Sequence, residues 1–162
     1  MDGYMRYIAG IIVMILVGLC GCGRNAMEGE LEKTQHILPD DNETMASFLE
    51  NIGDEYGDFT IEEASPNILE GDRILLQFGE ETLQFYLYAS NEEAEKDIAR
   101  ISKRGDKYTR EKENGETSTM LFSWNATPHF FRKENVIALY VGEEEQYTAM
   151  LQEFFGAQAA GE

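Results

Sequence analysis

Cysteine is scarce in this chain, occurring only at Cys20 and Cys22 among 162 residues. The chain beyond Cys22 can therefore form no disulfide bond, and it offers neither a thiol nucleophile nor a thiolate ligand for a metal ion. A metal or redox role for the Cys20 and Cys22 pair itself is disfavoured, because no other cysteine is present to complete the site. The stability of the remaining chain must come from a hydrophobic core.

Basic residues are also few, with 13 Lys and Arg against 31 Asp and Glu and a formal net charge of −18. Binding to a nucleic-acid backbone needs clustered Lys and Arg, so we expect no nucleic-acid partner. Hydrophobic residues make up 43% of the chain and aromatic residues 11%, which argues against wholesale disorder. The length is that of one domain.

A long apolar run occurs near the N-terminus, at residues 7–19, and it has 13 uncharged residues. As a helix this run would extend about 20 Å, which is short of the roughly 30 Å core of a bilayer. Its length and position are typical of a cleavable signal helix. Because Asp2 offsets Arg6, we expect Met5 rather than Met1 to be the initiator. An uncleaved signal anchor and an ordinary buried helix are the alternatives.

The apolar run ends in the sequence Leu19-Cys20-Gly21-Cys22. This sequence resembles the lipobox of bacterial lipoproteins, in which an aliphatic residue and two small residues precede the modified cysteine. The resemblance covers the leader only, and it implies cleavage before Cys22 and lipidation of the Cys22 thiol. Gly21 favours Cys22 over Cys20, because a signal peptidase needs room at the preceding residue and Leu19 would fill it. Two acyl chains would anchor the mature protein to a membrane.

Three regions are therefore expected. Residues 1–21 form the lipoprotein signal peptide, residues 22–39 a lipid-anchored flexible tether poor in apolar side chains, and residues 40–162 a single extracytoplasmic domain. The resemblance implies a location on the extracytoplasmic face of a bacterial cell membrane. All of the net charge lies after residue 21, so we expect the domain to be repelled by an anionic membrane surface.

The spacing of apolar residues predicts three amphipathic helices in this domain. Their apolar positions are Met45, Phe48, Leu49 and Ile52 in the first, Ala94, Ile98 and Ile101 in the second, and Tyr147, Met150, Leu151, Phe154 and Phe155 in the third. The expected N-terminal signals are Asp40, Asp41 and Asn42, then a capping box of Ser90 and Glu93, then Glu143, Glu144 and Glu145. The expected stops are Gly53, Gly105 and Gly156.

Short apolar or alternating runs predict strands at residues 59–64, 74–78, 83–88, 117–124, 129–131 and 136–141. Residues 79–81 are expected to form a hairpin turn between the second and third runs. Connections this short require antiparallel pairing. We therefore expect an α+β fold, with an antiparallel sheet of about five or six strands and three helices packed mainly on one face.

Seven of the 13 bases fall within residues 96–112, where the local net charge is +4. This segment is a candidate anion or partner patch, and its expected contributors are Lys96, Arg100, Lys103, Arg104 and Lys107. A patch of this kind could bind an envelope protein or a wall polymer. The alternative is a solvated helix end, since the helix dipole favours bases at a C-terminus.

Aromatic residues suggest a second candidate surface. Trp124, Tyr86 and Tyr88 are candidates for an aromatic groove that binds a ligand, and packing in the core is the alternative. His129 with Ser123 is the candidate for a small envelope hydrolase. However, the sequence has no Gly-x-Ser-x-Gly turn or other catalytic signature around these residues, so we expect no catalytic residues.

Clusters of acidic residues at 40–43 and 54–58 are candidates for divalent cation binding, but neither has the spacing of an EF-hand loop. Helix capping explains the first cluster. No glycine-rich phosphate loop is present either. We therefore expect neither a metal site nor a cofactor.

The segment 130–142, followed by a helix ending at residues 154–156, also resembles small lipoproteins of Gram-positive bacteria that have no assigned activity. That resemblance carries no functional residues. The sequence thus predicts a membrane-anchored lipoprotein whose domain is a non-enzymatic binding or accessory module of the cell envelope. A hydrolase using His129, and a structural or stress-related envelope protein without a ligand, are the alternatives.

Overall fold

The computed structural model describes residues 41–53, 56, 58–112 and 114–161. The expected signal peptide and tether, including Cys22, lie outside the described residues, and the region boundaries stay predictions. None of the helices among the described residues combines the length and the apolar character needed to cross a bilayer.

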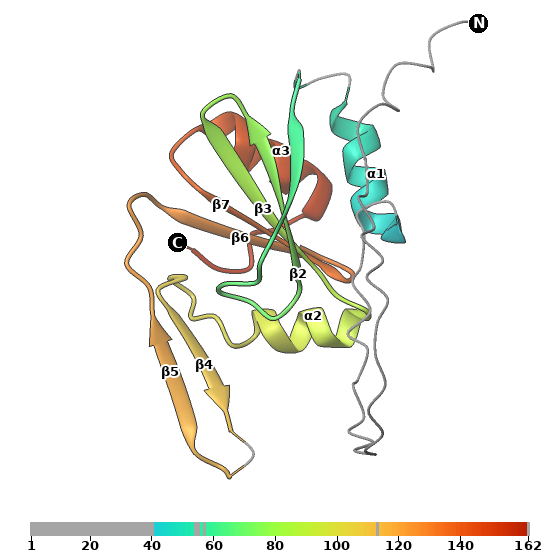
Figure 1. The fold of residues 1–162 in the computed structure, drawn as a ribbon. Helices are drawn as coiled ribbons and strands as arrows, with labels where there is room; N and C mark the ends of the chain where they lie inside the picture. Colours follow the sequence, from blue (N-terminus) through green and yellow to red (C-terminus); the bar gives the residue numbers. More distant parts are fainter. Residues whose placement is uncertain (1–40, 54–55, 57, 113, 162) are drawn as a thin grey trace, which may run out of the picture. The chain divides into compact units, whose positions relative to one another are not determined.

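The described chain contains three helices and seven strands (Figure 1). In chain order they are α1 Glu43–Ile52, β1 Thr60–Ala64, β2 Asp72–Phe78, β3 Glu81–Leu87, α2 Asn91–Ile98, β4 Lys107–Glu111, β5 Thr117–Leu121, β6 Pro128–Lys133, β7 Val136–Val141 and α3 Glu145–Phe155. Five strands form an antiparallel sheet in the order β1-β2-β3-β7-β6, and β4 and β5 form a separate two-stranded sheet. The α+β class and the antiparallel sheet are confirmed.

The five-stranded sheet is covered on both faces. The core on one face contains side chains from α1 and α3, including Met45, Phe48 and Leu151, packed against Phe85 of β3. The core on the other face contains Ala94 of α2, together with tyrosines and hairpin residues. Two of the three helices thus share a face, and α2 lies on the opposite one. Burial on both faces explains why β7 is an almost continuous apolar run rather than an alternating one.

Local signals position the first two helices as expected. The Asn42 side chain accepts a hydrogen bond from the Met45 amide at 3.0 Å and so caps α1. Ser90 caps α2 in the same way by accepting from the Glu93 amide at 3.3 Å. Between β2 and β3 the chain turns at Gly79, whose φ of 60° suits glycine.

The expected end of α2 was wrong. The helix stops at Ile98, with Ala99 as its C-cap, and Ile101 instead forms a β-bridge with Tyr108. Gly105, with a φ of 70°, lies in the turn before β4 rather than at the end of the helix. Ile101 fits the apolar spacing expected of the helix, but its side chain is buried by contact with β4 and not by packing of α2.

The structure also differs from the expected strands at two places. Strand β4 was not predicted, because only Tyr108 among its five residues is buried. The strand expected at 117–124 ends at Leu121, and Phe122 and Trp124 beyond it pack against each other. The hairpin formed by β4 and β5 extends away from the five-stranded sheet (Figure 1).

Candidate functional site

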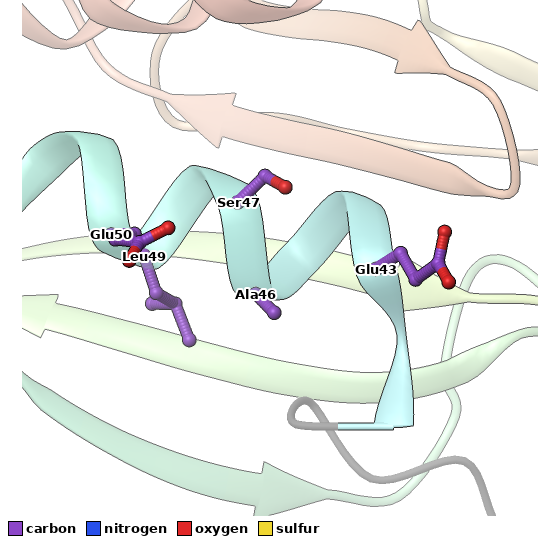
Figure 2. A pocket seen from close by; sticks show the side chains of 5 residues that line it. All are labelled: Glu43, Ala46, Ser47, Leu49 and Glu50. Carbon is purple, nitrogen blue, oxygen red and sulfur yellow. The ribbon is translucent and has the colours of Figure 1, made fainter.

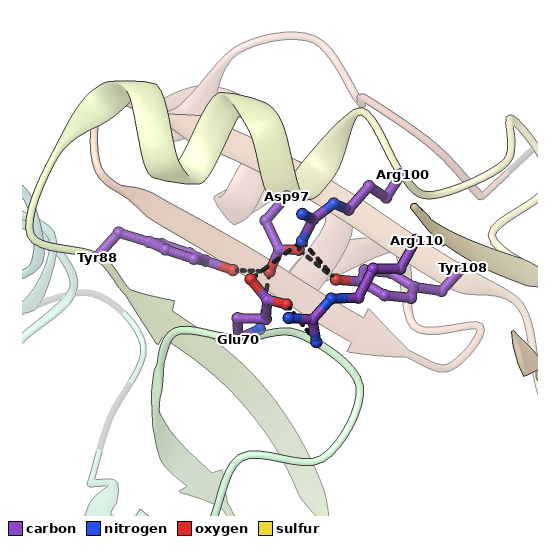
Figure 3. Close-up of polar contacts among 6 residues, drawn as sticks. All are labelled: Glu70, Tyr88, Asp97, Arg100, Tyr108 and Arg110. Carbon is purple, nitrogen blue, oxygen red and sulfur yellow. Dashed lines mark hydrogen bonds and ion pairs between the residues drawn. The ribbon is translucent and has the colours of Figure 1, made fainter. Parts of the chain in front are cut away.

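A polar cluster around Asp97 joins α2, the hairpin and the sheet (Figure 3). The Asp97 side chain is buried. Its Oδ2 accepts from the Tyr88 hydroxyl at 2.7 Å and from the Glu70 amide at 2.8 Å. Its Oδ1 accepts from the Tyr108 hydroxyl at 2.7 Å and from Arg100 Nη1 at 3.1 Å. Both oxygens of the buried carboxylate are thus fully satisfied, as burial of a charge requires.

Arg100 extends the Asp97 cluster towards the surface. Its Nη1 lies 3.0 Å from Glu70 Oε2, and Arg110 Nη1 lies 2.9 Å from Glu70 Oε1. Burial disfavours the charge on Arg100, but its hydrogen bonds to Glu70, Tyr108 and Asp97 outweigh that effect and raise its pKa. Arg100 is therefore a fixed cation whose charge is used within the domain.

The tyrosines of the Asp97 cluster keep their protons firmly. Burial raises the pKa of the Tyr88 and Tyr108 hydroxyls, and the hydrogen bond to the Asp97 carboxylate raises each further. Both groups therefore act as hydrogen-bond donors at neutral pH and not as proton acceptors. The hydrogen bonds of Asp97 thus connect α2 to β4 and to the segments beside β2 and β3. The carboxylate oxygens and the two tyrosine hydroxyls are enclosed by their hydrogen-bond partners.

The predicted basic patch is divided by the structure. Arg100 is engaged in the Asp97 cluster, whereas Lys96 is exposed on the last turn of α2. Lys103 and Arg104 are exposed in the turn before β4, and Lys107 is exposed at the start of β4. In the part of the chain that the structure describes, no ion pair is recorded for these four residues. The exposed cations that remain adjacent in the chain are Lys103, Arg104 and Lys107.

The predicted aromatic residues lie in the core under α2 and not in an open groove. Tyr86 and Tyr88 are buried, and the Tyr86 hydroxyl donates to Asn67 Oδ1 at 2.6 Å. Trp124 is half-buried, and its Nε1 donates to the Gly105 carbonyl at 2.8 Å. Tyr86 and Tyr88 belong to one hydrophobic cluster, and Trp124 packs against it.

His129 is held between two carbonyl oxygens. Its Nδ1 lies 3.1 Å from Gln158 Oε1, its Nε2 lies 3.2 Å from the Gly142 carbonyl, and its ring stacks on Tyr140. Among the described residues, no hydroxyl or carboxylate is recorded in a hydrogen bond to this ring. His129 therefore serves here to position the C-terminal segment, and the hydrolase alternative stays a prediction.

Two surface pockets involve the first helix. One, of about 550 Å³, is lined by residues of α1 alone, of which Ala46 and Leu49 are half-buried and the others are exposed (Figure 2). The other, of about 360 Å³, is polar and lies where the starts of α1 and α2 meet the turn between β6 and β7. There the Thr44 hydroxyl donates to the Glu134 carboxylate, while Asn42 Nδ2 is buried and has no hydrogen-bond partner among the described residues.

In the described part of the chain, no group of three His, Cys, Asp or Glu side chains is placed so that it could hold a metal ion. Asp41 and Glu43 are exposed at the start of α1. Asp40, Asp54 and Glu55, which completed the two acidic clusters of the sequence, lie outside the described residues.

Asp97, Glu70 and Tyr108 were missed as a group by the sequence analysis. A signal for Asp97 was available, because it follows Ala94 by three residues and so falls on the buried side of α2. A carboxylate at such a position predicts buried hydrogen-bond donors. Its partners could not be identified, since Glu70 and Tyr108 come from separate segments.

Comparisons with known proteins give no family assignment. No protein-family model matches the chain, and neither curated proteins nor solved structures give a significant match.

Proposed function

We propose that this protein is a lipoprotein of a bacterial cell membrane, anchored on the extracytoplasmic face through Cys22. Its folded domain acts as a non-enzymatic binding or accessory module of the cell envelope. The observation that carries the proposal is the sequence Leu19-Cys20-Gly21-Cys22 directly after a 13-residue uncharged run. That run is too short to span a bilayer as a helix, so the acyl chains would provide the attachment.

The described domain supports a binding role through its surface. Lys103, Arg104 and Lys107 are three exposed cations close together in a sequence of net charge −18, and Asp106, which lies among them, offsets part of their charge. The neighbouring strand β5 exposes Met120 and Leu121. Positive charge beside exposed apolar side chains suits contact with an acidic protein surface or an anionic wall polymer.

Substitution of Cys22 tests the anchor directly. We expect the Cys22→Ala variant to lose labelling by radioactive palmitate and to retain its signal peptide, since the modified thiol and the cleavage signal are both removed. Cys20→Ala is the matched control, and it should be labelled, processed and recovered in the membrane fraction like the parent. Palmitate labelling that survives in Cys22→Ala would overturn the proposal.

A further inference from the structure

Strand β5 is the most exposed strand of the described domain. All five of its residues, Thr117 to Leu121, are exposed and none is charged. Met120 is 48% exposed and Leu121 is 71% exposed. Within the described residues only Ile61 joins them as an exposed large hydrophobic side chain. An uncharged strand of this kind is unusual at the surface of such an acidic protein.

The backbone of β5 has one free edge. The bonds from the Phe122 amide to the Asp106 carbonyl and from the Lys112 amide to the Glu116 carbonyl fix the alternation of the hairpin ladder. With the register of β4 and β5, they direct the N–H and C=O groups of Ser118 and Met120 towards β4. The corresponding groups of Thr117, Thr119 and Leu121 point away from β4. Among the described residues, none accepts from these three amides.

The other sheet edges are protected. The C-terminal segment covers β6, since the Phe130 amide donates to the Ala160 carbonyl and the Ala159 amide to the Phe130 carbonyl. The outer edge of β4 is covered because the Thr109 amide donates to the Arg100 carbonyl at 2.9 Å. Strand β1 carries two acidic side chains, Glu62 and Glu63, and charges on an edge strand discourage pairing with another chain. Strand β5 carries no charge, and within the described residues no other segment covers its outer edge.

We propose that β5 pairs with β5 of a second copy of this chain. An antiparallel arrangement centred on Thr119 uses all five residues, placing Thr119 opposite Thr119 of the second copy and Leu121 opposite Thr117. The outward N–H and C=O groups of both strands then form the hydrogen bonds of a four-stranded sheet. The contact is two-fold symmetric and closes on itself, so it produces a dimer and not a filament.

The charges on β4 agree with this pairing. Lys107 lies beside Leu121 and Glu111 beside Thr117 in the hairpin register. In the two end rows of the dimer, where Leu121 faces Thr117, Lys107 of one copy therefore lies at one end and Glu111 of the other copy at the opposite end. No two charges of the same sign face each other across the central pair of strands, where like charges would destabilise the sheet.

The dimer should be weak in dilute solution because the paired strands are short. Confinement of both copies to one membrane surface would raise their effective concentration and favour pairing. The pairing itself is independent of the lipid anchor. We therefore expect the dimer to be most abundant for the full chain in membranes of the producing bacterium.

Disulfide trapping in such membranes tests the dimer. In the proposed register the Cα atoms of the two Thr119 residues are about 5.5 Å apart, which is within the range that a disulfide bridges. We expect Thr119→Cys to give a disulfide-linked dimer on a non-reducing gel. Thr109→Cys is the matched control, because it lies on the same face but three strand spacings, about 14 Å, from its counterpart. Its dimer yield should be at least about tenfold lower.

A second pair of variants tests the backbone bonds. In the Thr119→Cys chain, Thr117→Pro removes an outward-pointing N–H that is not used within the hairpin, and the dimer yield should fall several-fold. Thr117→Val keeps that N–H and should retain the dimer. Circular dichroism of the purified variants establishes that each is folded.

Three results would overturn the dimer: equal yields for Thr119→Cys and Thr109→Cys, a disulfide from Thr119→Cys to a different protein only, or no effect of Thr117→Pro. A failure of the lipid anchor would appear separately. The parent chain, with unmodified thiols at Cys20 or Cys22, would then form a disulfide-linked dimer without any added cysteine.

Discussion

Four hydrogen-bond donors reach the Asp97 carboxylate from four different parts of the chain. Glu70 lies before β2, Tyr88 follows β3, Arg100 follows α2 and Tyr108 lies in β4. Removal of this one carboxylate would leave two buried hydroxyls without their acceptor and would leave the Arg100 guanidinium with Glu70 as its remaining carboxylate partner. The energetic cost of such a change comes mainly from the partners left unpaired.

We therefore expect Asp97→Ala to lower the free energy of unfolding by about 3–5 kcal/mol. Tyr108→Phe, which removes one donor and leaves the carboxylate three others, should cost about 1–2 kcal/mol. Urea unfolding followed by circular dichroism measures both. Glu95→Ala, an exposed neighbour on α2, is the control and should stay within about 0.5 kcal/mol of the parent. A loss in Asp97→Ala no larger than in Glu95→Ala would show that the cluster does not stabilise the fold.

At the scale of elements, the ion pairs of Glu70 link the hairpin to the loop before β2. Its carboxylate contacts Arg100, which follows α2, and Arg110 of β4. The Glu70 side chain is 45% exposed, so solvent screens both of its ion pairs, and most of all the pair with Arg110, which is 57% exposed. The hairpin therefore depends on several modest contacts, and we expect it to open locally more readily than the five-stranded sheet.

Hydrogen exchange of Glu70→Ala tests this link. Loss of the two ion pairs, together about 1 kcal/mol, should speed exchange of the β4 amides of Tyr108 and Arg110 about fivefold. Amides of Phe85 and Ala138 in the large sheet should be unchanged. Glu116→Ala, which removes an exposed pair with Lys112 at the far end of the hairpin, is the matched control and should affect only the turn. Equal acceleration across both sheets would contradict local opening.

The sequence predicted the elements whose signals are local. Asn42 and Ser90 cap their helices as expected, and the turn at Gly79 follows from its neighbours. The parts that sequence could not give depend on distant contacts. Ile101 looks helical by spacing but is buried by Tyr108, and β4 has too few apolar residues to stand out. For Trp124, Tyr86 and Tyr88 the sequence left an open groove and core packing as alternatives, because burial beneath α2 depends on the tertiary fold.

At the scale of the whole molecule, buried tyrosines link stability to alkaline pH. Burial raises the pKa of Tyr140 from 10.0 to about 12, and it also raises those of Tyr86, Tyr88 and Tyr108. Between these pKa values an unfolded chain releases the tyrosine proton while the folded chain keeps it. The unfolded state then binds fewer protons, so the free energy of unfolding falls as the pH rises.

We expect the stability gained from these tyrosines to be fully present below pH 10.0 and to decrease progressively above it, through about pH 12 for Tyr140. Urea unfolding at a series of alkaline pH values gives the slope, and absorbance of tyrosinate near 295 nm should rise together with unfolding. In Tyr140→Phe the slope should be shallower, because one titrating group is removed. A slope identical to that of the parent would contradict a role for Tyr140 in the alkaline transition.

The position of Trp124 has a practical consequence for spectroscopy. It is the single tryptophan of the chain, and it belongs to the hydrophobic cluster that includes Ala94 of α2 and Tyr108 of the hairpin. Intrinsic fluorescence therefore reports on one layer of the domain, while circular dichroism also follows the α1 and α3 layer. A difference between the two signals during unfolding would measure, without any added label, how tightly the two sides of the sheet are coupled.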